Sequence, residues 1–228
     1  MLSELGCHGG TGGKVLHLAP PKARVVVMAQ GDPRREAFET FVAGRFAEAY
    51  GATVSPTYPL LAGLIAPGGK ILAAAGVRLA EQGPLFLERY LDAPVEAEVS
   101  RALARPVFRE TIVEIGAFAS SHPAWSMQLF EALPPWLAAV AGRSFAVATL
   151  RPELARALGR AGFELNPIAD ADPARLGDDA GAWGSYYAGA PRVYAGPVAG
   201  GARLADLGER LQARSLQRQA RRAARASA

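Results

Sequence analysis

Glu114 is the acidic residue whose surroundings point most directly to chemistry. It stands between apolar neighbours in the run Ile112-Val113-Glu114-Ile115, where loss of water would raise the pKa of its carboxyl group and suit it to general-base catalysis. Side chains alternate along a strand, so Glu114 points to the opposite face from Val113 and Ile115. A solvent-facing carboxylate without a catalytic role is the alternative.

A second group of charged residues lies in the segment PLFLERYLDAPVE (84–96). Glu88, Asp92 and Glu96 lie close together there, and such carboxylates suggest a metal site or acid–base chemistry. No histidine accompanies them, so we predict no metal. Helix capping and local salt bridges are the structural alternative.

Arg109 and His122 flank the Glu114 segment on its two sides. Arg109 could hold a phosphate or a carboxylate with its two-pronged guanidinium group, or form a surface ion pair. His122, the one histidine beyond the first 22 residues, could contact a phosphate or relay a proton. A loop histidine without a role is the alternative.

Alternating strands and helices must position these residues. Strands are predicted at 23–30, 60–66, 70–78, 109–119, 144–150 and 163–169, and helices at 32–50, 85–103, 123–141 and 151–161. Asp32 and Pro33 would begin the first helix, Pro94 would divide the second, and Pro134 with Pro135 would break or kink the third. Pro67-Gly68-Gly69 predicts a hairpin. The order indicates a mixed α/β sheet.

Composition sets the limits of the domain. Half of the residues are hydrophobic and a fifth are charged, as in an ordinary globular protein. We expect a disordered, glycine-rich leader over 1–22, one domain over 23–202 and a basic helix or tail over 203–228. No secretory signal or membrane span is predicted. The single cysteine, Cys7, cannot form an internal disulfide and fits a cytoplasmic location.

The basic character of the chain is concentrated at its C-terminal end. Seven arginines against two carboxylates give residues 203–228 a formal charge of +5, so residues 1–202 carry −1 of the total of +4. A solvated helix is one interpretation of this segment. An electrostatic contact for an acidic partner is the other.

The order of elements resembles the GNAT superfamily of acyltransferases. In that fold, mostly antiparallel, the fourth strand splays from the fifth, and the pantetheine arm of an acyl-thioester donor lies in the gap. The corresponding strands here are TIVEIGAFAS (111–120) and SFAVATL (144–150). Gly162-Phe163, at the end of PELARALGRAGFEL (152–165), resembles the end of the superfamily's last helix.

A narrower resemblance is to the bacterial thermostable hemolysin family. It rests on PLFLERYLDAPVE (84–96), IVEIGAFAS (112–120), WGSYYAGAPRVYAG (183–196) and AAAGVRLA (73–80), and it covers roughly residues 34–198. The family pattern has Asn where this chain has Ala117, so any role of that amide is absent here. The family is itself similar to the N-acyl-homoserine-lactone synthases, which carry a glutamate in the context of Glu114.

The resemblance implies roles for individual residues. Glu114 would be the catalytic base, and Tyr187 would reprotonate the leaving thiolate, with aromatic packing of Tyr186 and Tyr187 as the alternative. Acceptor binding would involve Arg78 and the carboxylates Glu88 or Asp92. Donor binding would involve the backbone of the fourth strand together with two side chains: Gly116, Ala117, Phe118, Ala119, His122 and Arg109.

The donor and partner follow from a departure from the GNAT pattern. The glycine-rich loop that binds the coenzyme A pyrophosphate is replaced by Ser120-Ser121-His122-Pro123-Ala124-Trp125-Ser126, which has no glycine. Acyl carrier protein, with one phosphodiester, is therefore the expected donor and partner rather than coenzyme A. We expect no permanently bound cofactor, only an acyl-phosphopantetheine substrate, and no nucleic acid partner.

Three functions remain open at this point. The first is transfer of an acyl chain to a small amine or amino acid. The second is a GNAT-like module that binds without catalysis, which the missing glycine loop would suit. The third is the membrane-active hemolysin of the family name, which would need an insertion segment or barrel strands that the sequence does not display.

Overall fold

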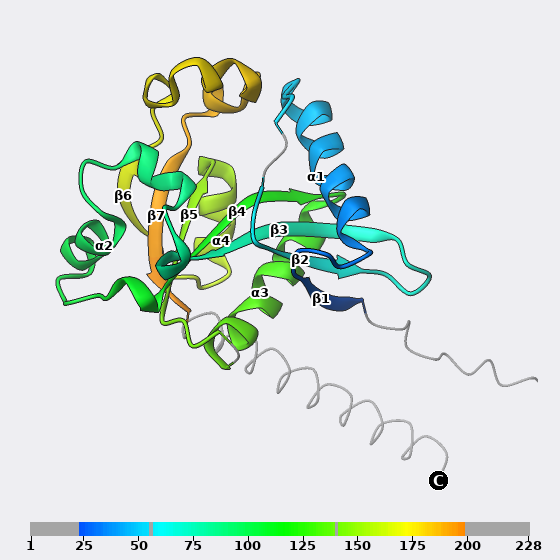
Figure 1. Ribbon diagram of the computed structural model, residues 1–228, viewed down its shortest axis with the longest axis horizontal. Coiled ribbons are helices and arrows are strands. Elements are labelled where there is room, and N and C mark those ends of the chain that lie inside the picture. Colours follow the sequence, from blue (N-terminus) through cyan, green and yellow to red (C-terminus); the bar gives the residue numbers. More distant parts are fainter. Residues whose placement is uncertain (1–22, 55–56, 140, 199–228) are drawn as a thin grey trace, which may run out of the picture.

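Seven strands form one open sheet in the part of the chain that the computed structural model describes, residues 23–54, 57–139 and 141–198 (Figure 1). The sheet order is β1-β2-β3-β4-β5-β7-β6, and every neighbouring pair is antiparallel except β4 and β5. The strands are β1 Arg24–Met28, β2 Leu60–Ile65, β3 Ile71–Leu79, β4 Ile112–Ser120, β5 Phe145–Leu150, β6 Asn166–Asp170 and β7 Arg192–Pro197. The predicted leader (1–22) and basic tail (203–228) lie outside the described residues.

Helices cover both faces of this sheet. The α-helices are α1 Arg35–Tyr50, α2 Val95–Leu103, α3 Pro123–Ala139 and α4 Pro152–Arg160, and short 3₁₀-helices lie at η1 Ala80–Gln82, η2 Phe86–Tyr90, η3 Arg109–Thr111, η4 Pro173–Trp183 and η5 Tyr186–Gly189. The predicted fold class, a mixed and mostly antiparallel α/β sheet flanked by helices, is confirmed.

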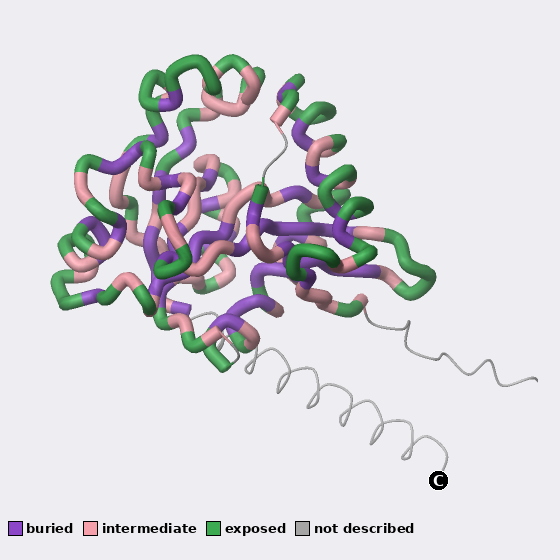
Figure 2. The backbone as a smooth tube through the Cα atoms, viewed as in Figure 1, coloured by how far each residue is buried: buried purple, intermediate pink, exposed green. Residues whose placement is uncertain are grey.

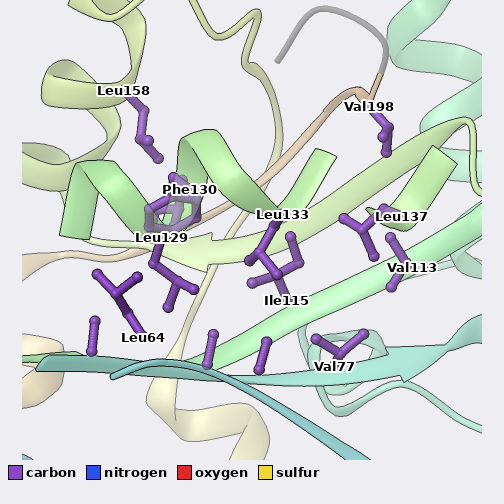
Figure 3. Close-up of a cluster of buried hydrophobic side chains, with 14 of the residues drawn as sticks. Leu64, Val77, Val113, Ile115, Leu129, Phe130, Leu133, Leu137, Leu158 and Val198 are labelled. Carbon is purple, nitrogen blue, oxygen red and sulfur yellow. The ribbon is translucent and has the colours of Figure 1, made fainter. Parts of the chain in front are cut away.

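The main core lies between the sheet and helices α3 and α4. Four side chains of α3 pack on strand residues that point to this face (Figure 3), namely Leu129, Phe130, Leu133 and Leu137 on Leu64, Val77, Val113 and Ile115. All but Phe130 and Ile115 are almost completely buried. Figure 2 shows the resulting pattern, with buried positions along the central strands and exposed ones along the outer side of α1.

Helix α1 covers the other face of β2, β3 and β4. Its Phe38, Val42 and Phe46 are buried there, and Gly63 on β2 makes room for Phe38, because a Cβ atom at Gly63 would lie 2.0 Å from the Phe38 ring. Farther along the sheet, η2, α2 and η4 cover the same face over β5 and β7. The Glu114 side chain points to this face, and those of Val113 and Ile115 point to the other, as the alternation of side chains along a strand predicts.

Strands β4 and β5 pair over three residues and then separate. The pairs are Ile112 with Phe145, Val113 with Ala146, and Glu114 with Val147. Beyond Glu114, β4 continues to Ser120 and β5 to Leu150 without pairing with each other. The splay predicted from the GNAT resemblance is therefore confirmed, and it begins next to Glu114.

A β-bulge lies on β4 just after the splay begins. One residue of β3, Ala75, stands opposite two residues of β4, Ala117 and Phe118, between the pairs Gly76–Gly116 and Ala74–Ala119. Ala117 adopts a left-handed conformation with a φ of 47°. A Cβ atom disfavours that conformation, so the position stores strain beside the separating strands.

Several predicted elements differ from the observed ones. Helix α1 begins at Arg35 rather than at Asp32, because Asp32 accepts a hydrogen bond from the backbone N–H of Arg34 and forms a turn that precedes the helix. Helix α3 runs through Pro134 and Pro135 without a break. Residues 109–111 form η3 rather than strand, the last predicted strand is shifted to Asn166–Asp170, and strand β7 was not predicted.

Candidate functional site

A cavity of about 540 Å³ opens where β4 and β5 separate. The walls come from the second half of β4, the end of β5 and the first turns of α3 and α4. On the other face they come from α1, η2, η4 and η5. Glu114 lies at the narrow end of this cleft, and the beginnings of α3 and α4 lie at its wide end.

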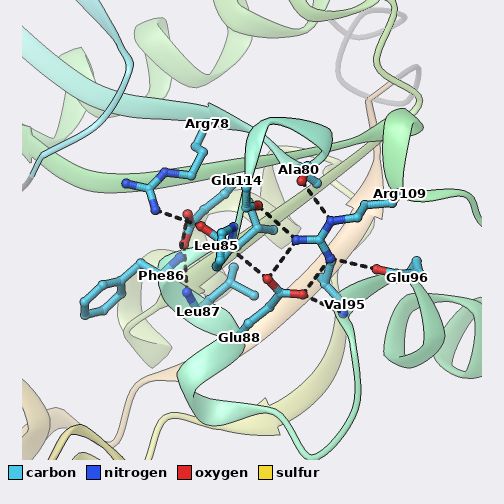
Figure 4. Close-up of polar contacts among 12 residues, drawn as sticks. Arg78, Ala80, Leu85, Phe86, Leu87, Glu88, Val95, Glu96, Arg109 and Glu114 are labelled. Atoms are coloured by element: carbon cyan, nitrogen blue, oxygen red, sulfur yellow. Dashed lines mark hydrogen bonds and ion pairs between the residues drawn. The ribbon is translucent and has the colours of Figure 1, made fainter.

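Glu114 is almost completely buried, with 2% of its surface exposed. Its two carboxylate oxygens accept hydrogen bonds from the backbone N–H groups of Phe86 (3.0 Å) and Leu87 (2.9 Å) at the start of η2 (Figure 4). Burial raises the pKa of this carboxyl, and the two N–H groups and the nearby Arg78 oppose that rise. The solvent-facing alternative is therefore wrong, because η2 covers this position.

Arg109 and Glu88 hold the loop that covers Glu114 (Figure 4). The guanidinium group of Arg109 donates to both oxygens of Glu88 (2.7 and 2.9 Å) and to Glu96 (2.9 Å). It also donates to the carbonyl oxygens of Ala80 (2.8 Å) and Gly83 (3.0 Å). A guanidinium group has five N–H donors, so Arg109 has none left for a ligand.

Glu88 completes this network from η2. Its oxygens also accept the backbone N–H groups of Leu85 (2.8 Å) and Val95 (3.1 Å). The Arg109 guanidinium, and after it these N–H groups, lower the pKa of Glu88 to about 2. Glu88 is thus a fixed anion that orders the chain before Pro94, and the structure does not support the predicted contact with a substrate ammonium.

Asp92 also lies away from the cleft. Its carboxylate is exposed and pairs with Arg175 (2.7 Å), and neither residue lines the cavity. Arg109, Glu88 and Asp92 all make ion pairs within the protein, so the geometry favours the structural alternatives given for them above.

Arg78 lies beside the site, one strand away from Glu114. It is opposite Glu114 in the register of β3 and β4, and it donates to the carbonyl oxygens of Pro84 (3.0 Å) and Thr57 (2.7 Å). Its guanidinium group lies over the Tyr58 ring, 5.2 Å from the centroid. Arg78 also lines a smaller cavity of about 220 Å³ that adjoins the cleft through Phe86, Ala117 and Trp183.

Tyrosines form the wall that faces Glu114 and the bulge. The hydroxyl groups of Tyr90 and Tyr187 share a hydrogen bond, and burial raises the pKa of both phenols. Tyr186 packs edge-on against Tyr187 and against Tyr50 of α1. Tyr187, the predicted proton donor, is thus within the cleft, and its hydroxyl proton is kept at neutral pH.

Tyr58 is a member of this wall that the sequence did not reveal. It is buried, and burial raises the pKa of its phenol well above the ordinary value. Its side chain lies against Gly76 and Gly116, where a Cβ atom would come within 2.3 Å of the ring and 1.9 Å of the hydroxyl oxygen, respectively. No periodic pattern marks Tyr58, because it lies in the loop before β2; the two glycines on neighbouring strands are the one signal in the sequence.

The cleft also contains predicted donor-binding residues at and beside the bulge and before α3. Gly116, Ala117 and Phe118 line it, whereas Ala119 is buried against α1. His122 lines the cleft just before α3, and its Nδ1 accepts the backbone N–H of Ala124 (3.2 Å). Ser120 and Ser126 share a hydrogen bond of 2.7 Å between their hydroxyl groups.

Among the described residues, no three or more His, Cys, Asp or Glu side chains come together in a way that could hold a metal ion. None of the described helices has the length and apolar character needed to cross a bilayer.

Comparisons with known proteins agree on one type of fold. The family model described as thermostable hemolysin matches residues 28–202. The structure resembles the CoA-dependent acyl-homoserine lactone synthase BjaI with SAM and isopentyl-CoA (13% identity, 81% of this chain and 87% of that one, TM-score 0.54). It also resembles FeeM, an N-acyl amino acid synthase from uncultured soil microbes (17%, 79% and 94%, 0.51), and the AHL synthase LasI (12%, 77% and 91%, 0.51). A search of curated proteins finds no match.

Proposed function

The chain belongs to the thermostable hemolysin family, and from that premise we propose that it is an N-acyltransferase. It would move an acyl chain from an acyl-thioester to a small amine or amino acid. The observation that carries this proposal is a buried glutamate, Glu114, at the narrow end of a cleft between two separating strands.

The unpaired edge of β4 supports binding of a pantetheine arm. After Glu114, the backbone of β4 is paired with β3 on one side and has no strand partner on the side of β5. The amide groups of a pantetheine arm can bond to such an edge as an added strand would. The arm would then run from the wide end of the cleft, and its thioester would lie near Gly116–Phe118.

Glu114 is suited to take a proton from the acceptor amine. A carboxylate has about four lone-pair sites and Glu114 uses two of them, so each oxygen keeps one site for a water molecule or an ammonium group. Because burial raises its pKa, the carboxylate is a better base than an exposed one. The neutral amine attacks the thioester carbonyl, and the C–N bond forms.

Negative charge then develops on the thioester, first on its carbonyl oxygen and then on its sulfur. Backbone N–H groups of β4 near the bulge would stabilise the oxyanion, as preorganised dipoles do in acyl transfer. The C–S bond then breaks, and the thiolate takes a proton from Tyr187, whose hydroxyl group is protonated because burial raises its pKa. The Tyr90 hydroxyl, bonded to it, would orient that proton. The extra proton on the attacking nitrogen returns Tyr187 to its neutral form and leaves a neutral amide.

An acyl carrier protein is the donor we favour over coenzyme A. The segment before α3 has no glycine, and the His122 side chain already accepts one of the first N–H groups of the helix. A pyrophosphate needs several such N–H groups together. A single phosphodiester, as a carrier protein presents, needs fewer.

The acceptor would enter from the face of α1 and η2, where the aromatic wall and Arg78 lie. The Glu114 carboxylate lies on this face of the sheet, where it accepts two backbone N–H groups of η2. We assign Arg78 to acceptor binding, since it lines the smaller cavity that adjoins the cleft. We assign no substrate contact to Glu88, Asp92 or Arg109, because their charges are paired within the protein.

Product formation tests the proposal. Acyl carrier protein charged with an acyl chain is mixed with pooled amines and amino acids, and the products are analysed by mass spectrometry. We expect an acyl-amine with the wild-type protein and a loss of about 10²- to 10⁴-fold with Glu114→Gln, the range for a general base. Glu110→Gln, an exposed carboxylate just before β4, is the matched control and should retain activity.

The alternatives make different predictions in the same experiment. A binding module would yield no acyl-amine above background with any variant, although it would still bind the carrier protein. A membrane-active protein would lyse vesicles equally well with and without Glu114→Gln. Either result in the absence of product would refute the enzymatic proposal.

A further inference from the structure

Arg151 is a cationic residue of the cleft that the proposed reaction does not use. It follows the last residue of β5 and is the N-cap residue of α4, and it lines the wide end of the cavity. Its Nε atom is buried and has no hydrogen-bond partner among the described residues. The nearest carboxylate, that of Glu153, is 3.6 Å away, and its side chain is 63% exposed.

The surroundings hold the Arg151 guanidinium group in position and use only part of its donor capacity. The guanidinium group lies over the Tyr50 ring, 5.4 Å from the centroid, and a hydrogen bond with the Tyr50 side chain raises the pKa of Arg151. Gly189 in η5 leaves space for it, because a Cβ atom there would lie 2.4 Å from Nε. A side chain that is packed on two sides and still has free donors is prepared to bind an anion.

Arg45 lines the same end of the cleft but differs from Arg151 in its contacts. It donates to the carbonyl oxygen of Ser120 (3.0 Å) and also to Glu48, so part of its donor capacity and much of its charge are used within the protein. Arg151 has a looser ion pair, at 3.6 Å from Glu153, and a buried Nε atom without a hydrogen-bond partner, so of these two cleft arginines it has more capacity to spare.

The first turn of α4 adds to the positive potential at this point. No side chain caps the helix, Pro152 has no N–H group, and the first helical hydrogen bond runs from Ala155 N to Arg151 O. The N–H groups of Glu153 and Leu154 are thus free of intrahelical partners, and both residues line the cleft. An anion beside Arg151 would also meet these groups.

The position of Arg151 along β5 indicates which anion would bind. Val147 pairs with Glu114, and Arg151 is four residues farther along, which corresponds to about 13 Å of strand. The amine and carboxylate of an α-amino acid are separated by a single carbon atom, too short for this distance if the amine is next to Glu114. A pantetheine arm, which contains two amides, separates a thioester from a phosphate and is long enough for this distance.

We propose that Arg151, with the first turn of α4, binds the phosphate of the donor's phosphopantetheine arm. This inference rests on the proposed function, because it assumes a pantetheine arm in the cleft. The cleft then has two oppositely charged ends, with the Glu114 carboxylate at the acceptor amine and Arg151 at the donor phosphate. The arm would be bound in one direction along β4.

Calorimetric titration with pantetheine and with 4′-phosphopantetheine tests the inference without catalysis. The wild-type protein should bind the phosphorylated arm about 10- to 100-fold more tightly, the range for a charge-assisted contact. Arg151→Gln should abolish this preference and leave pantetheine binding unchanged, and Arg151→Lys should keep part of it. Arg175→Gln, which removes an exposed arginine outside the cleft, is the matched control and should behave as wild type.

Other outcomes overturn the inference in distinguishable ways. Equal affinity of the wild-type protein for the two arms would refute the role of Arg151 and leave the proposed function standing. Failure of both arms to bind would refute the donor cleft and the inference together. If Arg151→Gln instead weakened binding of phenylalanine relative to phenylalaninamide, the anion would be an acceptor carboxylate, and the phosphate assignment would be wrong.

Discussion

Acid should destabilise this protein through Glu88, and the structure gives the size of the effect. The pKa of Glu88 is lowered from 4.5 to about 2, first by Arg109 and then by two backbone N–H groups. A difference of that size corresponds to about 3 kcal/mol of folding stability. The Glu88 side chain is 19% exposed, so solvent screening reduces this figure only modestly.

The sign follows from the lowered pKa. The folded protein holds Glu88 as an anion more strongly than the unfolded chain does, so the contribution is fully present above about pH 4.5. It is lost as the pH falls through about 2, and at pH 3 about 2 kcal/mol of it should be gone. At pH 3 this loss arises because the unfolded chain takes up a proton at Glu88 while the folded protein still keeps most of the charge, and the Arg109 pair itself is neutralised only as the pH falls below about 2.

Urea unfolding of wild type and Glu88→Gln at pH 6 and pH 3 measures this contribution. Other carboxylates titrate in both proteins, so the difference between the two unfolding free energies isolates Glu88. We expect Glu88→Gln to be less stable at pH 6 by up to about 3 kcal/mol, and the difference to shrink by about 2 kcal/mol at pH 3.

A matched control comes from the neighbouring carboxylate that the structure leaves exposed. Asp92→Asn breaks a surface ion pair with Arg175 and should change stability by less than about 1 kcal/mol at either pH. If the free energies of unfolding of the wild type and Glu88→Gln differed by the same amount at pH 6 and at pH 3, the reasoning would be refuted. Glu88 would then not be the anion that Arg109 holds.

Three further substitutions test the packing and chemistry of the cleft. Gly116→Ala should lower the free energy of unfolding by about 1–3 kcal/mol, because its Cβ atom would lie 1.9 Å from the Tyr58 hydroxyl oxygen; adding Tyr58→Phe should recover part of the loss in denaturant titrations. Ala117→Gly should raise the unfolding free energy by about 0.5–1 kcal/mol, since it relieves a φ of 47°, and a decrease would contradict the strain. Tyr187→Phe should reduce acyl-amine formation about 10²-fold or more, whereas Tyr90→Phe removes the same hydrogen bond and should keep most of the activity; equal losses would argue against Tyr187 as the proton donor.

The sequence predicted the parts of the fold that depend on local patterns. Apolar runs marked β2, β3, β4 and β5, and the hairpin at Pro67-Gly68-Gly69 was confirmed by the pairing of β2 with β3 and by two glycines with positive φ. Strand β7 was missed, because its residues follow an aromatic and glycine-rich segment without period, and its strand character depends on pairing with β5 and β6. Helix α3 tolerates Pro134 and Pro135 because Leu133 and Leu137 fix it to the sheet.

The site was predictable only where a residue's role depends on its own strand. Glu114 was identified from its apolar flanks, and its burial agrees with that reasoning. Its covering by η2 could not be predicted, since Phe86 and Leu87 are 28 and 27 residues away in the sequence. Tyr58 and Arg151 were missed for a related reason, because their importance comes from neighbours on other elements.

Arg109 and Arg151 show what distinguishes a structural charge from a functional one in this protein. Both are arginines at the end of a strand or beside it, and the sequence favoured Arg109, which precedes the Glu114 strand. In the structure Arg109 uses all five of its donors, whereas Arg151 has a buried Nε atom without a partner. A charge whose hydrogen bonds are complete contributes to stability, and replacing it should cost unfolding free energy first. A charge that the fold holds rigid with unused donors has capacity for a ligand, so replacing Arg151 should cost affinity and leave stability nearly unchanged.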